Sequence, residues 1–322
     1  MSAFILSLVL TAAPTDVVVL PGKDMAAKHI VLISGDEEYR SEDVMSQWAR
    51  ILNSHHGFKC TVLFALDTDG VVNPNKSNIP GLEALQTADL MCIFTRFRNL
   101  PDEQMQHVAE YIKSGKPIIG LRTATHAFNN SKGSKYAKYA WNNQVSGHEG
   151  GFGKQILGET WVSHHGKHGS EGTRGRIAKG ALNHVILNGI REEMLFGTTD
   201  VYTANPPKDA TILVFGEVTD SLKPDSKAVT GKKNEPMMPI AWTRETDGRR
   251  VFTTTFGAST DLESEGVRRL LVNAAYWALK MDGTIPSASR VDIVGAFNVT
   301  PFGTKKDDAW KKIDKRPADF FK

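Results

Sequence analysis

The sequence predicts an α/β fold built on a doubly wound, mainly parallel sheet with additional β-strands. From Lys28 onward, short apolar runs typical of buried strands alternate with amphipathic segments typical of helices. This alternation indicates parallel strands, because each crossover helix returns the chain to the same edge of the sheet. The length of 322 residues and the 40% hydrophobic content allow a large core.

Four strands and two helices are expected in the first half of the chain. The strands are predicted at residues 29–33, 60–66, 90–95 and 117–121, and we expect the order 2-1-3-4-5 in the sheet. Ser41 is expected to cap the first helix, with Glu42 and Asp43 in its first turn, where negative charge suits the helix dipole. Pro101 is expected to open the second helix, which ends before Gly115.

The second half of the chain begins with a break in this pattern. Residues 129–176 are rich in glycine and histidine with little periodicity, which predicts a long loop over the sheet. Further strands are predicted at 211–218, 238–243 and 250–256, with a hairpin turn at Asp247-Gly248. A closing helix is expected over 264–280. Residues 28–281 then form one domain, and residues 282–322 form an extended tail docked on it by scattered aromatic rings.

The N-terminal segment and the composition limit the class of protein. The apolar run of residues 3–13 is too short to span a membrane and has the length of a signal-peptide core, so residues 1–22 are expected to be a signal peptide or a disordered N-terminus of an exported protein. The alternative is a hydrophobic first strand in a cytoplasmic protein.

Lys and Arg number 39 against 36 Asp and Glu, a surplus too weak for a dedicated nucleic-acid binder. Two cysteines exclude a disulfide scaffold and a Cys-rich zinc module.

Polar residues follow the predicted strands at the edge where doubly wound sheets bind ligands. We expect one group of side chains to converge there: Asp36, Glu37, Tyr39, Arg96, Arg98, Arg122 and His126. The fourth strand runs into a tight turn whose elbow position is Arg122, and arginine cannot act as a nucleophile. His126, four residues further on, is a candidate general base. Solvated turns and structural ion pairs remain the alternative for the charged residues.

A group of histidines in the glycine-rich loop is the candidate metal site. His148, His164 and His168 could bind a divalent ion such as zinc, since histidine is the commonest metal ligand. No established zinc-binding motif is present, so the alternative is a loop that hydrogen-bonds substrate through His164 and His165.

Cys60 and Cys92 lie inside strands that the first strand separates, which predicts buried free thiols.

Several segments together resemble the trehalose-utilisation (ThuA-like) family over residues 28–281. They are HIVLISGDEEYR, PIIGLRTATHAF, NHVILNGI with the following TTDVY, PIAWTRETDGRRVFTTTFGA and RRLLVNAAYWAL. The resemblance implies a flavodoxin-like fold of the class I glutamine amidotransferase type, a role in carbohydrate metabolism that includes keto derivatives of disaccharides, and a place for Asp200 and Tyr202 at the border of the site. Many relatives carry histidine where this chain has Arg122 and Ala258, which puts in doubt any metal or acid-base role carried over from them.

Two functions remain in competition. The first is an enzyme, an isomerase or hydrolase, that acts on a small sugar derivative through acid-base groups chosen from His126, Asp36, Glu37 and Asp200. Its substrate-binding residues are expected to be Tyr39, Arg96, Arg98, Arg122, Tyr202, His164 and His165. The second is a sugar-binding or scaffold module that has lost the chemistry. A glutaminase is not expected, because it needs a cysteine at the elbow.

Overall fold

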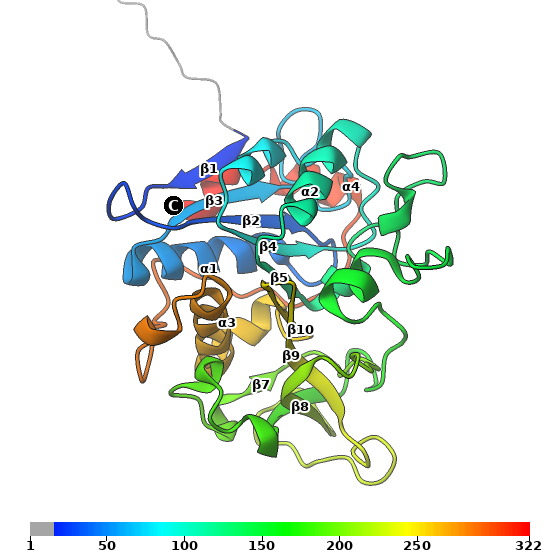
Figure 1. Cartoon of the computed structure of the whole chain (residues 1–322), viewed down its shortest axis with the longest axis vertical. Helices are drawn as coiled ribbons and strands as arrows, with labels where there is room; N and C mark the ends of the chain where they lie inside the picture. Colours follow the sequence, from blue (N-terminus) through cyan, green and yellow to red (C-terminus); the bar gives the residue numbers. More distant parts are fainter. Residues whose placement is uncertain (1–15) are drawn as a thin grey trace, which may run out of the picture.

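The computed structural model describes residues 16–322 and shows a mixed ten-stranded sheet in the order β1-β3-β2-β4-β5-β10-β9-β8-β6-β7 (Figure 1). The strands are β1 (Val17–Leu20), β2 (His29–Gly35), β3 (Lys59–Phe64), β4 (Leu90–Thr95), β5 (Ile118–Leu121), β6 (Gly172–Ile177), β7 (Phe196–Gly197), β8 (Thr211–Thr219), β9 (Met238–Thr246) and β10 (Arg249–Thr254). The α-helices are α1 (Ser41–His56), α2 (Asp102–Lys113), α3 (Glu265–Ala278) and α4 (Asp307–Ile313). Strands β3, β2, β4, β5 and β10 are parallel, which confirms the predicted α/β class and strand order.

Helices cover both faces of the parallel strands, with α1 and α3 on one face and α2 on the other (Figure 1). Strand β2 shows why: Ile30 and Leu32 pack in the core formed with α1 and α3, whereas Val31 and Ile33 pack in the core formed with α2. Successive side chains of a strand point to opposite faces, so a continuous apolar run is needed when both faces are buried. The carboxyl ends of these strands therefore deliver their loops to one edge of the sheet.

Two local expectations are corrected by the structure. Ser41 is the first residue of α1 and does not cap it; Arg40, with φ of 62°, precedes the helix instead. The Ser41 hydroxyl accepts a hydrogen bond from the backbone N–H of Asp36 at 2.9 Å, so it serves the loop after β2. The glycine-rich segment 129–176 is mostly irregular, but its end forms β6, an antiparallel partner of β8. Its glycines hid this strand because they weaken the usual strand signal.

The N-terminal residues that the structure describes also differ from expectation. Val17–Leu20 forms β1, an edge strand antiparallel to β3, so residues up to 22 do not all stay outside the fold. The predicted signal-peptide core at 3–13 lies outside the described residues, and export stays a prediction. Within residues 16–322, we find no helix with the length and apolar character needed to cross a bilayer.

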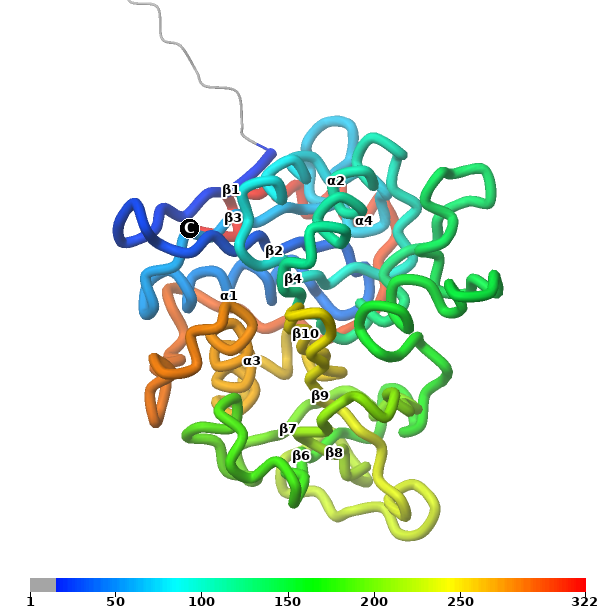
Figure 2. The backbone as a smooth tube through the Cα atoms, viewed as in Figure 1, coloured from blue at the N-terminus to red at the C-terminus, as the bar shows by residue number. Residues whose placement is uncertain are grey.

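The C-terminal tail crosses the α1 face of the domain and ends beside β1 and β3 (Figure 2). Arg50 of α1 donates hydrogen bonds to the carbonyl oxygens of Val294 and Ala296 at 3.0 Å each, and to that of Phe320 at 2.8 Å. The ring of Phe320 stacks on Phe64 of β3 with 5.4 Å between centroids. The tail was expected to be extended and pinned by aromatic rings; it also contains α4, which the sequence analysis missed.

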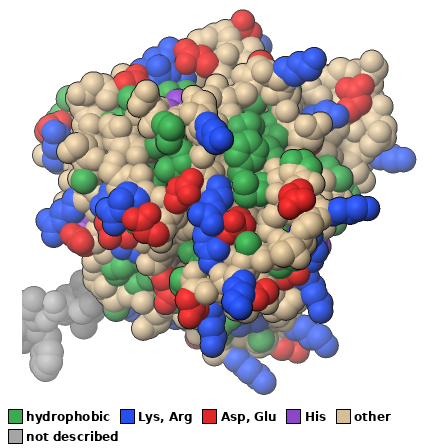
Figure 3. Space-filling view, turned by 90° about the horizontal axis from the view of Figure 1, so that it is seen from below, with side chains coloured by type: hydrophobic (Ala, Val, Ile, Leu, Met, Phe, Trp, Pro, Cys, Tyr) green, Lys and Arg blue, Asp and Glu red, His purple; other side chains and the backbone are tan. Residues whose placement is uncertain are grey.

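Acidic and basic side chains are mixed on the face of the molecule that Figure 3 shows. Neither sign forms a continuous stripe on that face, in agreement with the net charge of +3.

The buried carboxyl of Glu42 makes the stability of the fold depend on pH. Burial raises the pKa of Glu42 to about 8, although the Arg40 guanidinium 3.8 Å away favours the ionised form. Because the folded-state pKa lies above the unfolded one, the stabilisation is complete at low pH and is lost as pH rises from about 4.5 through 8. We expect Glu42→Gln to be more stable than the parent at pH 8.5, with a smaller difference at pH 5. Urea unfolding at both pH values measures this, and an equal difference at both would contradict the assignment.

Candidate active site at the carboxyl ends of the parallel strands

The elbow after β5 places a buried arginine in the middle of the site. Arg122 has a φ of 44°, in the left-handed region that is strained for a residue with a side chain. Its guanidinium lies between two tyrosine rings, 4.3 Å from the centroid of Tyr39 and 4.2 Å from that of Tyr202. It donates to the carbonyl oxygens of Thr255 at 2.8 Å and Asp200 at 3.0 Å, and to Oδ1 of Asp200 at 3.2 Å. Arg122 was expected to bind ligand; with 1% exposure and both faces covered, it instead holds protein groups together.

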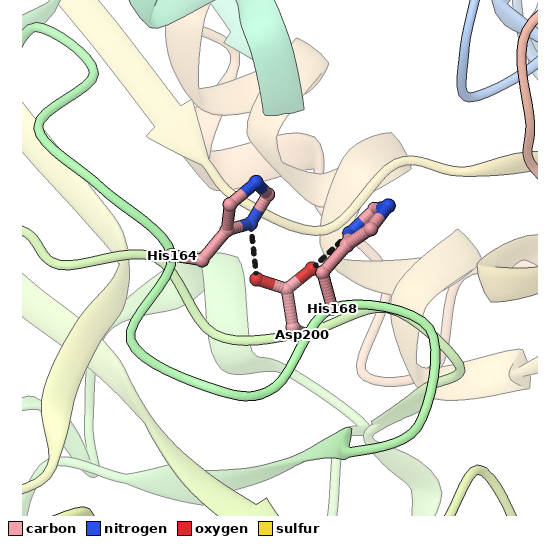
Figure 4. Close-up of side chains that lie close together, drawn as sticks. All are labelled: His164, His168 and Asp200. Carbon is pink, nitrogen blue, oxygen red and sulfur yellow. Dashed lines mark hydrogen bonds and ion pairs between the residues drawn. The ribbon is translucent and has the colours of Figure 1, made fainter.

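Asp200 joins two histidines of the glycine-rich loop to this arginine. Its Oδ2 lies 2.7 Å from Nδ1 of His164, and its Oδ1 lies 3.0 Å from Nδ1 of His168. Figure 4 shows the two rings on either side of the carboxylate, each turned toward it. The aspartate side chain is fully buried, whereas 38% of the His164 side chain and 36% of the His168 side chain are exposed. The cluster therefore presents imidazole to solvent over a buried charge.

The loop after β2 closes the other side of the cluster with a network of ion pairs. The Glu38 carboxylate lies 3.2 Å from Nε2 of His168 and pairs with Arg96 at 3.3 Å. Glu37 pairs with Arg96 and, at 2.9 Å, with Arg98. Burial raises the pKa of Glu37, and the charge of Asp36 adds to this, while Arg98 and Arg96 oppose it. Arg96 and Arg98 thus hold the acidic loop in place. This arrangement matches the structural ion pairs that were the alternative to a ligand-binding role for these residues.

Asp36 shapes this loop and does not act as a free acid. Its Oδ1 accepts from the backbone N–H groups of Glu38, at 2.8 Å, and Tyr39, and its Oδ2 accepts from the hydroxyl of Thr123 at 2.6 Å. The carboxylate is fully buried, and all of these partners belong to the turn after β2 or to the elbow. In this position Asp36 couples the two loops, and the catalytic role expected for it stays a prediction.

His126 lies under aromatic rings and is nearly inaccessible. Its ring packs against Phe97, Trp161 and Tyr202 at centroid distances of 4.7, 5.6 and 6.3 Å. Burial, with smaller contributions from Arg96, Arg122 and His164, lowers the pKa of His126 well below its ordinary value. With 2% exposure, His126 is covered by these rings and packs beneath the site residues. Contact between His126 and a substrate, as expected from the sequence, does not fit this buried position.

Two other predicted histidines do not join the cluster. His165 points away from Asp200 and places Nε2 2.8 Å from the carbonyl oxygen of Lys233. The chain bends directly after His164, which forms an isolated β-bridge with Tyr202. His148 is exposed in a separate turn and lies outside the group of possible metal ligands. Glu38 belongs to the run of acids after β2 that the sequence indicated as a possible wall of the site, although it was not among the expected site residues. Sequence reasoning missed Phe302 of the tail, for which no signal was present.

The donor atoms of His164, His168 and Asp200 lie within 4.8 Å of one another, and they form the candidate metal site of the described residues. Their types suit zinc. However, the permanently charged Arg122 already bonds Asp200, and each Nδ1 lies at hydrogen-bond distance from a carboxylate oxygen, with room for a proton between them. A second cation beside Arg122 is disfavoured by charge repulsion. The arrangement thus fits a hydrogen-bonded cluster better than a metal centre.

The two cysteines are remote from this chemistry. Cys60 lies in β3 and Cys92 in β4, on either side of β2, and both are buried and free, as predicted. Burial raises the pKa of both thiols, so neither supplies a thiolate.

The fold and the elbow define an α/β protein with a parallel central sheet in which a buried arginine stands at the turn after β5. The family model described as "ThuA: Trehalose utilisation" matches residues 30–278. The chain belongs to this family, as the motifs of the sequence analysis indicated. A comparison with curated proteins gave no match.

One solved structure supports the fold, and two others are reported beside it as weaker matches. A ThuA-like protein from Parabacteroides merdae superposes with a TM-score of 0.50 at 13% identity, over 87% of this chain and 98% of that chain. A carbohydrate deacetylase, Agd3, gives a TM-score of 0.43 at 12% identity, over 79% of this chain and 32% of that chain. A cytoplasmic protein from Salmonella typhimurium gives a TM-score of 0.43 at 13% identity, over 80% of this chain and 99% of that chain. At these identities the likeness concerns the fold alone.

Removal of either thiol is expected to leave function intact. We predict that Cys60→Ala and Cys92→Ala each lower the free energy of unfolding by about 1 kcal/mol, because the lost sulfur leaves a small cavity in the core. Any activity of the protein should remain, since no thiol reaches the site. Chemical denaturation and an activity assay on both variants test this; loss of activity in a folded Cys92→Ala protein would point to thiol chemistry.

Equimolar zinc is expected to leave the melting temperature unchanged, because Arg122 already neutralises Asp200. Thermal unfolding of chelator-treated protein, with and without added zinc, measures the effect. A rise in melting temperature that His168→Ala abolishes would instead establish a metal centre.

Proposed function

We propose that this member of the trehalose-utilisation family converts a sugar or keto-sugar derivative by proton transfer at His164, oriented by Asp200. The observation that carries the proposal is the hydrogen bond of 2.7 Å between His164 Nδ1 and a fully buried carboxylate. Such a bond selects the tautomer with the proton on Nδ1 and leaves Nε2 as the basic nitrogen. Among residues 16–322, no group hydrogen-bonds to this Nε2 in the structure, so it is free to meet a ligand.

The charges around His164 suit a base that gains a proton during reaction. When Nε2 takes a proton from a hydroxyl, or from a carbon beside a carbonyl, the ring becomes an imidazolium next to Asp200. The carboxylate stabilises that charge, and Arg122, which packs on the ring of Tyr202, keeps the carboxylate in place. The reaction needs no cysteine nucleophile, in agreement with the arginine at the elbow.

Aromatic rings beside His164 support a carbohydrate ligand. Trp161 lies edge-on to the His164 ring at a centroid distance of 5.8 Å, and Trp141 lies 6.1 Å from Trp161. Both indoles are partly exposed. Flat rings beside a polar group favour sugars, which present C–H groups on one face and hydroxyls at the edge.

A sugar-binding module without catalysis is the second candidate function. The arginine at the elbow favours it, since Arg122 is fully occupied by Asp200, Thr255 and the two tyrosine rings. In that case the His164–Asp200 pair would only donate and accept hydrogen bonds to hydroxyls.

Proton transfer can be measured without knowledge of the final product. We expect the protein to exchange the hydrogen beside the carbonyl of 3-keto disaccharides for deuterium in heavy water, followed by NMR. His164→Gln should slow this exchange by about 10²–10⁴-fold, the usual contribution of a general base. His165→Gln is the matched control, because its ring faces Lys233, and it should retain the exchange. Binding without exchange in the parent protein would favour the non-catalytic module, and exchange unaffected by His164→Gln would remove His164 as the base.

A further inference from the structure

Six aromatic rings follow one another across the site in a continuous series, which we call the aromatic row. Its members, in order, are Phe97, Trp141, Trp161, His164, His168 and Phe302. Neighbouring centroids are 5.3, 6.1, 5.8, 4.7 and 5.1 Å apart. Each step is therefore a direct contact between rings.

All six rings are partly exposed, although aromatic side chains of this size are normally covered when they can be. They come from three separate parts of the chain: the turn after β4, the glycine-rich loop and the C-terminal tail. Partly open aromatic rings that come together from distant segments beside a few polar groups are typical of ligand-binding surfaces. The aromatic row is such a surface.

We propose that the aromatic row binds a carbohydrate chain of three or more sugar units. The sugar unit that reacts lies beside His164. This inference rests on the proposed function for the position of the reacting unit. The rings continue on both sides of the His164–His168 pair: Trp161, Trp141 and Phe97 lie beyond His164, and Phe302 lies beyond His168. A single sugar ring at His164 would leave the outer rings uncovered, whereas a longer chain covers them.

Polar groups beside the row match the hydroxyl edges of such a chain. The Arg96 guanidinium lies 4.8 Å from the ring centroid of Phe97, and a quarter of its side chain is exposed. Glu38, joined to His168, lies beside the other part of the row with a side chain that is 14% exposed. Both signs are present and paired, so a neutral sugar chain suits this surface better than a strongly charged polymer.

The tail fixes one end of the row in place. Gly303, next to Phe302, donates its N–H to the carbonyl oxygen of Glu38 at 2.7 Å, and its own carbonyl accepts from Arg40 at 2.9 Å. The ring of Phe302 also packs on Tyr39 with 5.5 Å between centroids. These contacts attach Phe302 to the loop after β2. A ring that stacks on a ligand benefits from being fixed in this way before the ligand binds.

The dependence of affinity on chain length tests the proposal. Isothermal titration of the full chain with α-linked and β-linked glucose oligomers of one to six units is expected to show affinity that rises about tenfold or more from one unit to four for one linkage. Phe97→Leu and Phe302→Leu, which keep apolar volume but remove the ring at either end of the row, should each lower affinity for the longer oligomers and leave that for the monomer unchanged. Tyr136→Leu is the control, because this partly exposed ring lies outside the row. Thermal unfolding of each variant shows whether it is folded.

The outcomes separate this proposal from the function on which it rests. Affinity that does not rise beyond one unit for either linkage, or equal losses for monomer and tetramer in both variants, would overturn the aromatic row as a chain-binding surface. Deuterium exchange on 3-keto disaccharides would be unaffected by that result. Conversely, chain-length dependence without exchange would support the row and leave His164 without its proton-transfer role.

Discussion

The contact between Arg122 and Asp200 holds the site together. A buried guanidinium needs hydrogen-bond acceptors and compensating charge, because unpaired burial is costly. Asp200 supplies both, and the Tyr39 and Tyr202 rings cover the two faces of the cation. Once the carboxylate is fixed in this way, His164 and His168 have a defined partner, although they lie in a loop rich in glycine. The rigidity of the site therefore comes from one ion pair at the elbow.

Much of the fold could be predicted because its signals are local. Strands β2, β3, β4 and β5 are short apolar runs, and a run that is apolar at every position fits only a strand buried on both faces. Strand β6 (GTRGRI) could not be recognised in the same way, since two glycines and two arginines hide its alternation. It forms because β8 offers it an antiparallel partner, which is a tertiary cause.

The place of the site on the sheet could be predicted from the sequence better than the role of each residue in it. The parallel strands bring Tyr39, Arg96 and Arg122 to one edge, as their places after strands implied. The role of each depended on distances that no local pattern contains. Arg122 was expected to face ligand and is enclosed by protein; His164 was grouped with His148, but its partner is Asp200, 36 residues further along the chain. Phe302 lies in a tail without any motif, so its contact with His168 follows only from the folded chain.

The path of the tail has a consequence for the order in which the protein matures. Residues close to the C-terminus complete a surface whose other parts come from the loop after β2, and Gly303 anchors them there through Glu38 and Arg40. Synthesis runs from the N-terminus, and Arg40 and Gly303 are 263 residues apart in the chain. The sheet can therefore assemble before Phe302 has been synthesised, whereas the aromatic row is complete only after the tail has been added. The order of synthesis thereby separates the folding of the sheet from the completion of this surface.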